Sequence, residues 1–400
     1  MIKWKEAELG EYCDFQEGYV NPSKEHPEYF GGSVKWCRAV DINDGYIYHT
    51  SQTLTEEGFK SAKKSALLFE PNTIVISKSG TIGRVGIIKD YMCGNRATIN
   101  IKPKNNADVE FIFYMLKSKQ REFADLAVGS VQKNLYVSIL EKIKFKFPSL
   151  DNQKKISSYI STIDKKIEIN NQINRNLSEQ LDSLYSELST CQKWEYVAID
   201  ELADKIAMGP FGSNIKVSTF VERGIPIISG NHLRGHFLEE PSYNYITEEH
   251  AEKLKNSNVY PKDVIFTHAG NIGQVAMIPD DSEYDRYVIS QRQFYLRCNL
   301  EKVLPEYVTL FFHSNEGQQE LLSYANQVGV PSIAQPVKNL KKIQIPLPPI
   351  DVQREWLTIV KPMISLHQKT SKENKRLVLL RDSLLPKLMS GRLDVSELDI

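Results

Sequence analysis

The chain has 400 residues, of which 41% are hydrophobic and 25% charged, a composition that excludes a disordered or fibrous protein and allows two to four domains. Fifty basic and fifty acidic side chains cancel, so any affinity for nucleic acid has to come from local surfaces rather than bulk charge. The sequence shows no stretch of the ~18 apolar residues of a membrane span and no signal peptide at Met1, and its five cysteines are scattered. We therefore expect a cytoplasmic protein without a disulfide framework.

Residues 1–150 have the pattern of an α+β domain. Short segments rich in β-forming residues alternate with Gly, Asn and Pro turns, and an amphipathic stretch predicts a helix near residues 109–126. The predicted strands are 73–77, 85–89, 98–102 and 143–147. A long helix then follows over residues 151–192, because Asp151 is a suitable N-cap and a heptad pattern runs on from it.

The second half of the chain repeats this plan, which is the strongest signal in the sequence. The matched pairs include Trp4 with Trp194, Gly80 with Gly270, Arg96 with Arg292 and Gln153 with Gln353. The sequence therefore predicts a second α+β domain over residues 193–350, and a second long helix with a C-terminal tail over residues 351–400.

The predicted helices share a heptad seam that is apolar at its ends and polar in its middle. Two antiparallel helices would place Asn170 and Asn174 opposite Thr370 and Asn374, so that polar residues meet polar ones. A seam that only dimerises the chain is the alternative. The seam positions are Ile160, Ile163, Ile167, Asn170, Asn174, Leu177, Leu181 and Leu184 on the first helix, and Val360, Met363, Thr370, Asn374, Leu377 and Leu384 on the second.

The order of the segments has a topological consequence. An antiparallel helix pair returns the end of the chain to Trp4, which makes the molecule pseudo-circular with a pseudo-twofold axis. A helix of about 37 residues spans roughly 55 Å, so the pair forms a coiled-coil spacer between two similar domains. This geometry suits a protein that reads two half-sites on one DNA duplex, because the spacing of the domains sets the spacing of the sites.

Candidate DNA-contacting residues gather around glycine turns and nearby amide-rich or basic stretches. The turn at residues 77–84 offers free backbone N–H groups, hydroxyls and cations, and its counterpart at residues 267–274 offers His, Asn and Gln instead. A shared structural β-turn and exposed polar strand residues are the alternative interpretations. The candidates are Arg38, Asn43, Lys78, Ser79, Thr81, Arg84, Arg96, Ser213, Asn214, His232, Arg234, His268, Asn271, Gln274, Gln291, Arg292 and Gln293.

The duplicated domain, each copy closed by an Ile-x-(Ile/Phe)-x-(Leu/Phe)-Pro-x-(Leu/Ile)-Asp-x-Gln segment and a long helix, resembles the specificity subunits of type I restriction–modification systems. The Ser-Gly-Thr-Ile-Gly and Ala-Gly-Asn-Ile-Gly turns share this resemblance, which covers essentially the whole chain. It implies two target-recognition domains that each read one half of a bipartite, asymmetric site in double-stranded DNA. It also implies helices that dock two methyltransferase subunits, and restriction subunits in the full complex.

The resemblance further implies a non-catalytic chain in a system that methylates host DNA and defends against foreign DNA. The chain itself then needs no cofactor, and S-adenosylmethionine, ATP and Mg²⁺ belong to the partner subunits. The sequence agrees, since it contains no nucleotide-binding glycine loop and no methyltransferase motif. His232 and His236 lie four residues apart, but Gly235 interrupts a helix there, so surface or DNA-facing histidines are favoured over a zinc site.

Two alternatives from other functional classes stay open at this point. One is a catalytic chain such as a nuclease, and the other is a scaffold with two protein-binding domains. The charges alone do not decide between them, because residues 1–150 carry 21 basic and 18 acidic side chains and residues 196–350 carry 14 and 18.

Overall fold

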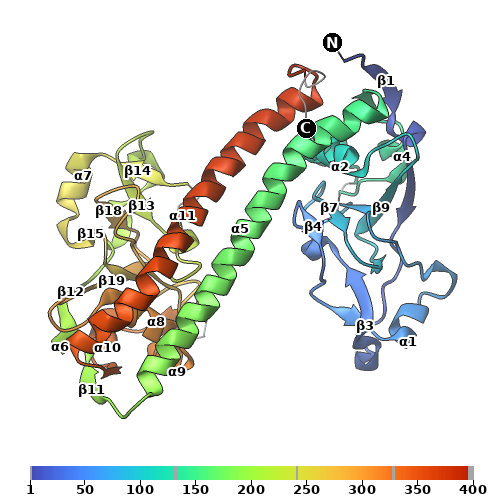
Figure 1. Ribbon diagram of the computed structural model, residues 1–400. Coiled ribbons are helices and arrows are strands. Elements are labelled where there is room, and N and C mark those ends of the chain that lie inside the picture. Colours follow the sequence, from blue (N-terminus) through green and yellow to red (C-terminus); the bar gives the residue numbers. More distant parts are fainter. Residues whose placement is uncertain (1, 130–132, 240–241, 327–328, 395–400) are drawn as a thin grey trace. The chain divides into compact units, whose positions relative to one another are not determined.

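The computed structural model describes residues 2–129, 133–239, 242–326 and 329–394 (Figure 1). The chain divides into two compact units, unit 1 with Met1–Ile167 and Leu377–Ile400 and unit 2 with Glu168–Arg376. Each unit contains one globular head and a segment of both long helices, α5 (Leu150–Thr190) and α11 (Ile350–Met389). Both helices begin one residue before the predicted starts.

The head of unit 1 contains three sheets, with strand orders β2-β9-β6-β7-β4, β5-β3-β8 and β1-β10. Strands β6 and β7 are buried along their whole length, as expected of apolar strands at the centre of a core. The strands are β1 (Lys5–Glu8), β2 (Cys13–Glu17), β3 (Phe30–Cys37), β4 (Tyr46–Ile47), β5 (Thr53–Leu54), β6 (Ile74–Ser77), β7 (Val85–Ile88), β8 (Met92–Gly94), β9 (Thr98–Pro103) and β10 (Lys144–Phe147). The helices are α1 (Glu56–Lys60), α2 (Val109–Ser118), α3 (Gln120–Leu126) and α4 (Val137–Leu140).

The head of unit 2 contains sheets β12-β19-β16-β17, β14-β13-β18-β15, β11-β22 and β20-β21. The strands are β11 (Glu195–Ala198), β12 (Ala203–Met208), β13 (Ile225–Ile228), β14 (Asn244–Ile246), β15 (Asn258–Val259), β16 (Val264–Thr267), β17 (Val275–Met277), β18 (Tyr287–Ile289), β19 (Gln293–Cys298), β20 (Ala325–Asn326), β21 (Ser332–Ile333) and β22 (Gln344–Leu347). The helices are α6 (Ile199–Leu202), α7 (Glu248–Lys253), α8 (Pro305–His313), α9 (Asn315–Leu322) and α10 (Pro336–Leu340).

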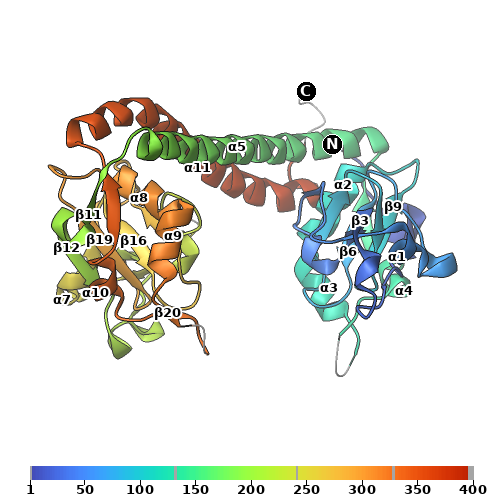
Figure 2. The same cartoon turned by 90° about the horizontal axis from the view of Figure 1, so that it is seen from below.

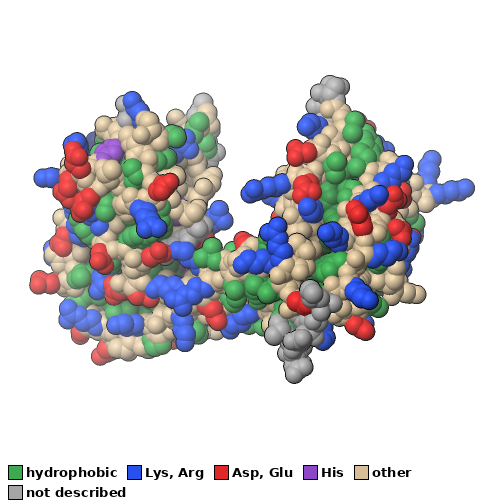
Figure 3. Space-filling view, turned by 90° about the horizontal axis from the view of Figure 1, so that it is seen from above, with side chains coloured by type: hydrophobic (Ala, Val, Ile, Leu, Met, Phe, Trp, Pro, Cys, Tyr) green, Lys and Arg blue, Asp and Glu red, His purple; other side chains and the backbone are tan. Residues whose placement is uncertain are grey.

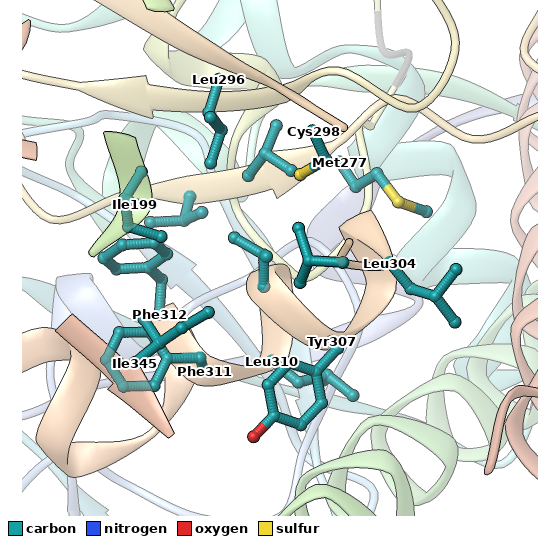
Figure 4. Close-up of a cluster of buried hydrophobic side chains, with 14 of the residues drawn as sticks. Ile199, Met277, Leu296, Cys298, Leu304, Tyr307, Leu310, Phe311, Phe312 and Ile345 are labelled. Atoms are coloured by element: carbon teal, nitrogen blue, oxygen red, sulfur yellow. The ribbon is translucent and has the colours of Figure 1, made fainter. Parts of the chain in front are cut away.

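The core of the second head lies between its main sheet and α8 (Figure 4). Tyr307, Phe311 and Phe312 of α8 are fully buried and pack in one cluster with Leu296 of β19 and Ile345 of β22. The same cluster takes in residues of both long helices within this unit. At ~25 cal/mol per Å² of apolar surface, a cluster of this kind is the main source of stability for the head.

The two heads are copies of one fold, as the sequence repeat predicts. The order β12-β19-β16-β17 reproduces β2-β9-β6-β7, and the pair β11-β22 reproduces β1-β10. The register corrects one detail of the sequence alignment, because Ser77 pairs with Thr98 while Thr267 pairs with Gln293. Ala97 is therefore the structural counterpart of Arg292, and Arg96 lies one residue earlier.

A buried glutamine explains the Asp-x-Gln segment that ends each head. The Gln153 side chain accepts a hydrogen bond from the backbone N–H of Asp108 at 2.9 Å and donates one to the carbonyl of Pro148 at 3.1 Å. Gln353 accepts from the N–H of Leu304 at 2.9 Å and donates to Pro348 at 2.7 Å. Both side chains are buried, so each one satisfies backbone groups where a head meets the start of its long helix.

Within each unit the two helix segments are antiparallel, as predicted. In unit 2 the side chain of Asn170 bonds to Asn374, and Asn174 bonds to Ser371, so the partner number falls as the α5 number rises. In unit 1, Ile156 and Ile160 of α5 share a core with Leu385 and Leu388 of α11. Every predicted seam position is buried or half-buried.

The C-terminal end of α11 returns to the beginning of the chain, as a pseudo-circular arrangement requires. Gly391 has a positive φ of 72° and lies against the indole of Trp4, where a Cβ atom would come within 2.5 Å of Nε1. The matching Trp194 donates its indole N–H to the carbonyl of Leu188 at the end of α5, at 2.8 Å. Each tryptophan therefore joins the start of a head to the end of a long helix. Within the described residues, the helices are too short or too polar to cross a bilayer.

Candidate nucleic-acid interface

Four backbone segments meet at one edge of the main sheet in the first head. The β6–β7 turn is closed by a bond from the N–H of Gly83 to the carbonyl of Ser77 at 2.9 Å. The Lys78 N–H then donates to Ala97, and its carbonyl accepts from Leu135, at 2.8 and 2.9 Å. The N–H of Gly18, just after β2, donates to Thr98 at 3.0 Å. We call this place the loop edge of the head.

The second head builds the same loop edge with different side chains. The His268 N–H donates to Arg292 at 2.9 Å, and its carbonyl accepts from Ile333 at 2.8 Å. Gly209, just after β12, donates to Gln293 at 2.8 Å. In Figure 2 the β20–β21 hairpin, which contains Ile333, lies at the end of this head opposite its helix segments. A common backbone frame therefore presents variable side chains, so the two interpretations of the glycine turns are compatible.

In the first head the exposed polar groups at the loop edge are those of Arg96 and Thr81, and Ser79 and Arg84 are half-buried. Lys78 is different, because its ammonium pairs with the carboxylate of Glu17 at 2.7 Å and both side chains are largely buried. The positive charge of Lys78 is thus already neutralised within the head.

In the second head the exposed polar groups are those of Gln291, Arg292, Asn271 and Asn214. His268 is half-buried, and burial lowers the pKa of its imidazole below the usual value, while its Nε2 lies 3.1 Å from the carbonyl of Gln291. A neutral imidazole at this position hydrogen-bonds without adding positive charge. Gln274 is half-buried and accepts from Thr267 at 3.3 Å, and the side chain of Ser213 lies outside the described residues.

Two predicted residues of the first head serve mainly to hold loops. Arg38 donates to Ser51 at 2.7 Å, and its guanidinium lies 5.2 Å from the centroid of the Trp36 ring. Arg38 lies beside the loop edge, because Cys37, the residue before it, accepts a hydrogen bond from the N–H of Asn95 at 3.1 Å. Asn43 closes a tight turn by accepting from the N–H of Gly45 at 3.2 Å.

Three polar residues that the sequence places on a surface are buried in the second head, which corrects that expectation. His232 is 4% exposed, stacks on Tyr243, and has its Nε2 2.9 Å from the carbonyl of Ser242. His236 is 6% exposed and pairs with Asp182 of α5 at 2.8 Å. Gln293 is 1% exposed and bonds to Ser290. Arg234 is exposed. In this conformation the side chains of His232 and Gln293 are therefore covered and bonded within the head.

Charge on the heads is mixed rather than concentrated. Figure 3 shows Lys and Arg side chains interspersed with Asp and Glu over the face in view. In the part of the chain that the structure describes, no group of three or more His, Cys, Asp or Glu side chains is placed to bind a metal ion.

A family model described as the type I restriction modification DNA specificity domain matches residues 1–179 and again residues 192–377. The chain belongs to this family. Because the two matches correspond to the two copies of the repeat, the duplication seen in the sequence and in the fold is a duplication of the family's own domain.

Curated relatives match over nearly the full length. The type I restriction enzyme MjaIX specificity subunit of Methanocaldococcus jannaschii is 26% identical, over 95% of this chain and 91% of its own. The MjaVIII specificity subunit of the same organism is 21% identical, over 99% and 94%. The crystal structure of a type I restriction–modification S subunit from M. genitalium shares the fold, with a TM-score of 0.58, 18% identity and 97% and 96% coverage. The chain is therefore a specificity subunit of the type I class, which is a non-catalytic component.

Proposed function

We propose that each head of this specificity subunit reads one half of a bipartite, asymmetric DNA site through its loop edge. The observation that carries the proposal is the pair of equivalent loop edges with different side chains. Lys78 and His268 make the same two backbone hydrogen bonds, yet one carries a neutralised cation and the other an imidazole. Two loop edges with the same backbone structure but different side chains are suited to two half-sites that differ in sequence.

We further propose that the exposed side of the long helices docks two methyltransferase subunits. Ile359, Leu366 and Leu380 of α11 are 59%, 43% and 46% exposed and lie seven and fourteen residues apart, so they share one side of the helix. A stripe of apolar side chains on a charged helix favours a protein partner. Restriction subunits, and the S-adenosylmethionine, ATP and Mg²⁺ that the chemistry uses, belong to the partners, and the complex acts in the cytoplasm.

Exchange of a head tests the DNA-reading proposal. Residues 1–150 are replaced by the first head of another specificity subunit, and the methylated motif of a host carrying each complex is read by methylome sequencing. We expect one half of the motif to change and the other to stay, whereas a change in both halves contradicts the modular assignment.

The need for a partner is tested with purified components. Because charge on the heads is balanced, we expect the chain alone to bind its motif weakly and the complex with methyltransferase subunits to bind tightly. Strong site-specific binding by the chain alone contradicts this. Incubation of the same chain with DNA and divalent metal ions separates a nuclease from a specificity subunit, since only a nuclease cleaves.

A further inference from the structure

Both heads expose an aromatic ring within two residues of the glycine that begins one segment of the loop edge. Tyr19 follows Gly18 in the first head and is 43% exposed. Phe211 comes two residues after Gly209 in the second head and is 72% exposed. A single exposed aromatic residue needs no explanation, but one in each copy of the duplicated loop, within two residues of the matching glycine, suggests a shared use.

The backbone around these rings is held closely. A Cβ atom on Gly18 would lie 2.4 Å from the carbonyl oxygen of Asn95, and one on Gly209 would lie 1.9 Å from that of Ser290. The Asn214 side chain donates to the carbonyl of Phe211 at 2.8 Å, and the Nε2 of His250 lies 2.8 Å from the Asn214 carbonyl. The ring of Phe211 is thus presented to solvent by a fixed loop, so little conformational entropy is lost when it makes a contact.

The ring also lines an open hollow of about 1010 Å³ in the second head. Lys205, Lys253 and Lys255 line it together with Glu249 and Glu252, so charge there is nearly balanced. A ligand gains little net electrostatic attraction at this place. The ring of Phe211 offers an apolar contact there that does not depend on net charge.

We propose that Phe211 and Tyr19 pack against bases, each within the half-site read by its own head. This inference rests on the proposed function and adds the residues that give each loop edge an apolar contact beside its polar ones. Aromatic rings contact bases by stacking, by wedging into a base step or by touching the methyl group of thymine.

The test uses the assembled complex of this chain with its methyltransferase partner and duplexes that carry its methylated motif. Phe211→Ala is expected to weaken binding of the intact duplex by roughly tenfold or more, the range known for loss of an aromatic contact to a base. The loss should disappear on a duplex whose second half-site is scrambled, and Tyr19→Ala should show the same dependence on the first half-site. Phe211→Tyr, which keeps the ring, should retain affinity.

Matched controls lie at the opposite ends of the strands. Tyr91 is 59% exposed after β7, away from the β6–β7 turn, and Leu300 is 44% exposed after β19. Tyr91→Ala and Leu300→Ala should bind as the unmodified chain does.

Binding by Phe211→Ala within twofold of the unmodified chain, or a loss that does not depend on which half-site is intact, overturns the inference. Failure of the proposed function looks different, because the unmodified complex then shows no preference for its motif. An unchanged melting temperature for each variant establishes that folding is retained.

Discussion

The amide of Asn170 donates a hydrogen bond to the side-chain oxygen of Asn374 at 2.9 Å, in the contact between α5 and α11. Asn170 is fully buried and also donates to the carboxylate of Glu373 at 2.8 Å, while Asn374 donates to Asn171 at 2.8 Å. Buried polar partners in a helix seam fix its register, because any shifted pairing leaves them without hydrogen bonds.

Asn170→Leu should therefore destabilise unit 2 by about 1–3 kcal/mol, since it leaves half-buried polar groups of the partner helix without their donor. Urea unfolding of the chain measures the change. Replacing Asn374 by Leu as well should recover part of the loss, and Gln172→Ala, on the exposed side of α5, should have little effect. An Asn170→Leu chain as stable as the original would show that the seam does not depend on this pair.

A second prediction concerns acid stability. Burial, with a smaller contribution from the imidazole of His236, lowers the pKa of His313 to about 4 and that of His367 to about 4. The unfolded chain binds protons near pH 6.5, where the folded chain does not, so stability is complete above that pH and is lost as the pH falls from 6.5 towards 4. At pH 5 each of these two histidines should lower the free energy of unfolding by about 1–2 kcal/mol.

The contribution of one histidine is separable. His367→Leu removes a titrating group that packs edge-on against Phe237, so the fall in melting temperature between pH 7 and pH 5 should become smaller. Gln172→Ala, which changes an exposed side chain of α5 that does not titrate, is the control and should leave the pH profile unchanged. A steeper profile in His367→Leu would contradict the assigned direction of the pKa shift.

The sequence predicts what depends on periodicity and repetition, and predicts poorly what depends on local burial. The antiparallel seam follows from heptad spacing, so Asn170 and Asn374 could be paired in advance. His232 and Gln293 could not be placed, because a polar residue near a glycine turn has the same pattern whether it is exposed or covered. Tyr243 and Ser290 cover them, and only the folded loops reveal this. The sequence repeat pairs Arg96 with Arg292, whereas the strand register pairs Ala97 with Arg292, because a one-residue shift between copies of a repeat leaves no trace in composition.

The junction between the chain termini leads to a third prediction. Gly391→Ala should be unfavourable for two reasons. The backbone φ of 72° suits glycine, and the added Cβ atom would lie 2.5 Å from the indole nitrogen of Trp4. We expect unit 1 to lose about 1–2 kcal/mol of unfolding free energy, since positive φ and a steric clash add. Thermal unfolding measures it, with Ser390→Ala as the neighbouring control. Equal melting temperatures for the two variants would mean that the end of α11 does not pack on Trp4 in solution.

The last prediction tests the helices as a spacer between half-sites. One heptad is inserted after Asn174 in α5 and a matching heptad before Thr370 in α11, where these two side chains are hydrogen-bonded. Both helices then lengthen together by about 10 Å, which corresponds to roughly three base pairs of DNA. The methylated motif should keep both half-sites and gain about three base pairs in the gap. The same insertion in α5 alone puts Asn170 and Asn374 out of register, so that chain should unfold at lower urea concentration and methylate poorly. An unchanged gap in the doubly extended chain, or an altered half-site, would show that the helices do not set the distance between the bases that the two heads read.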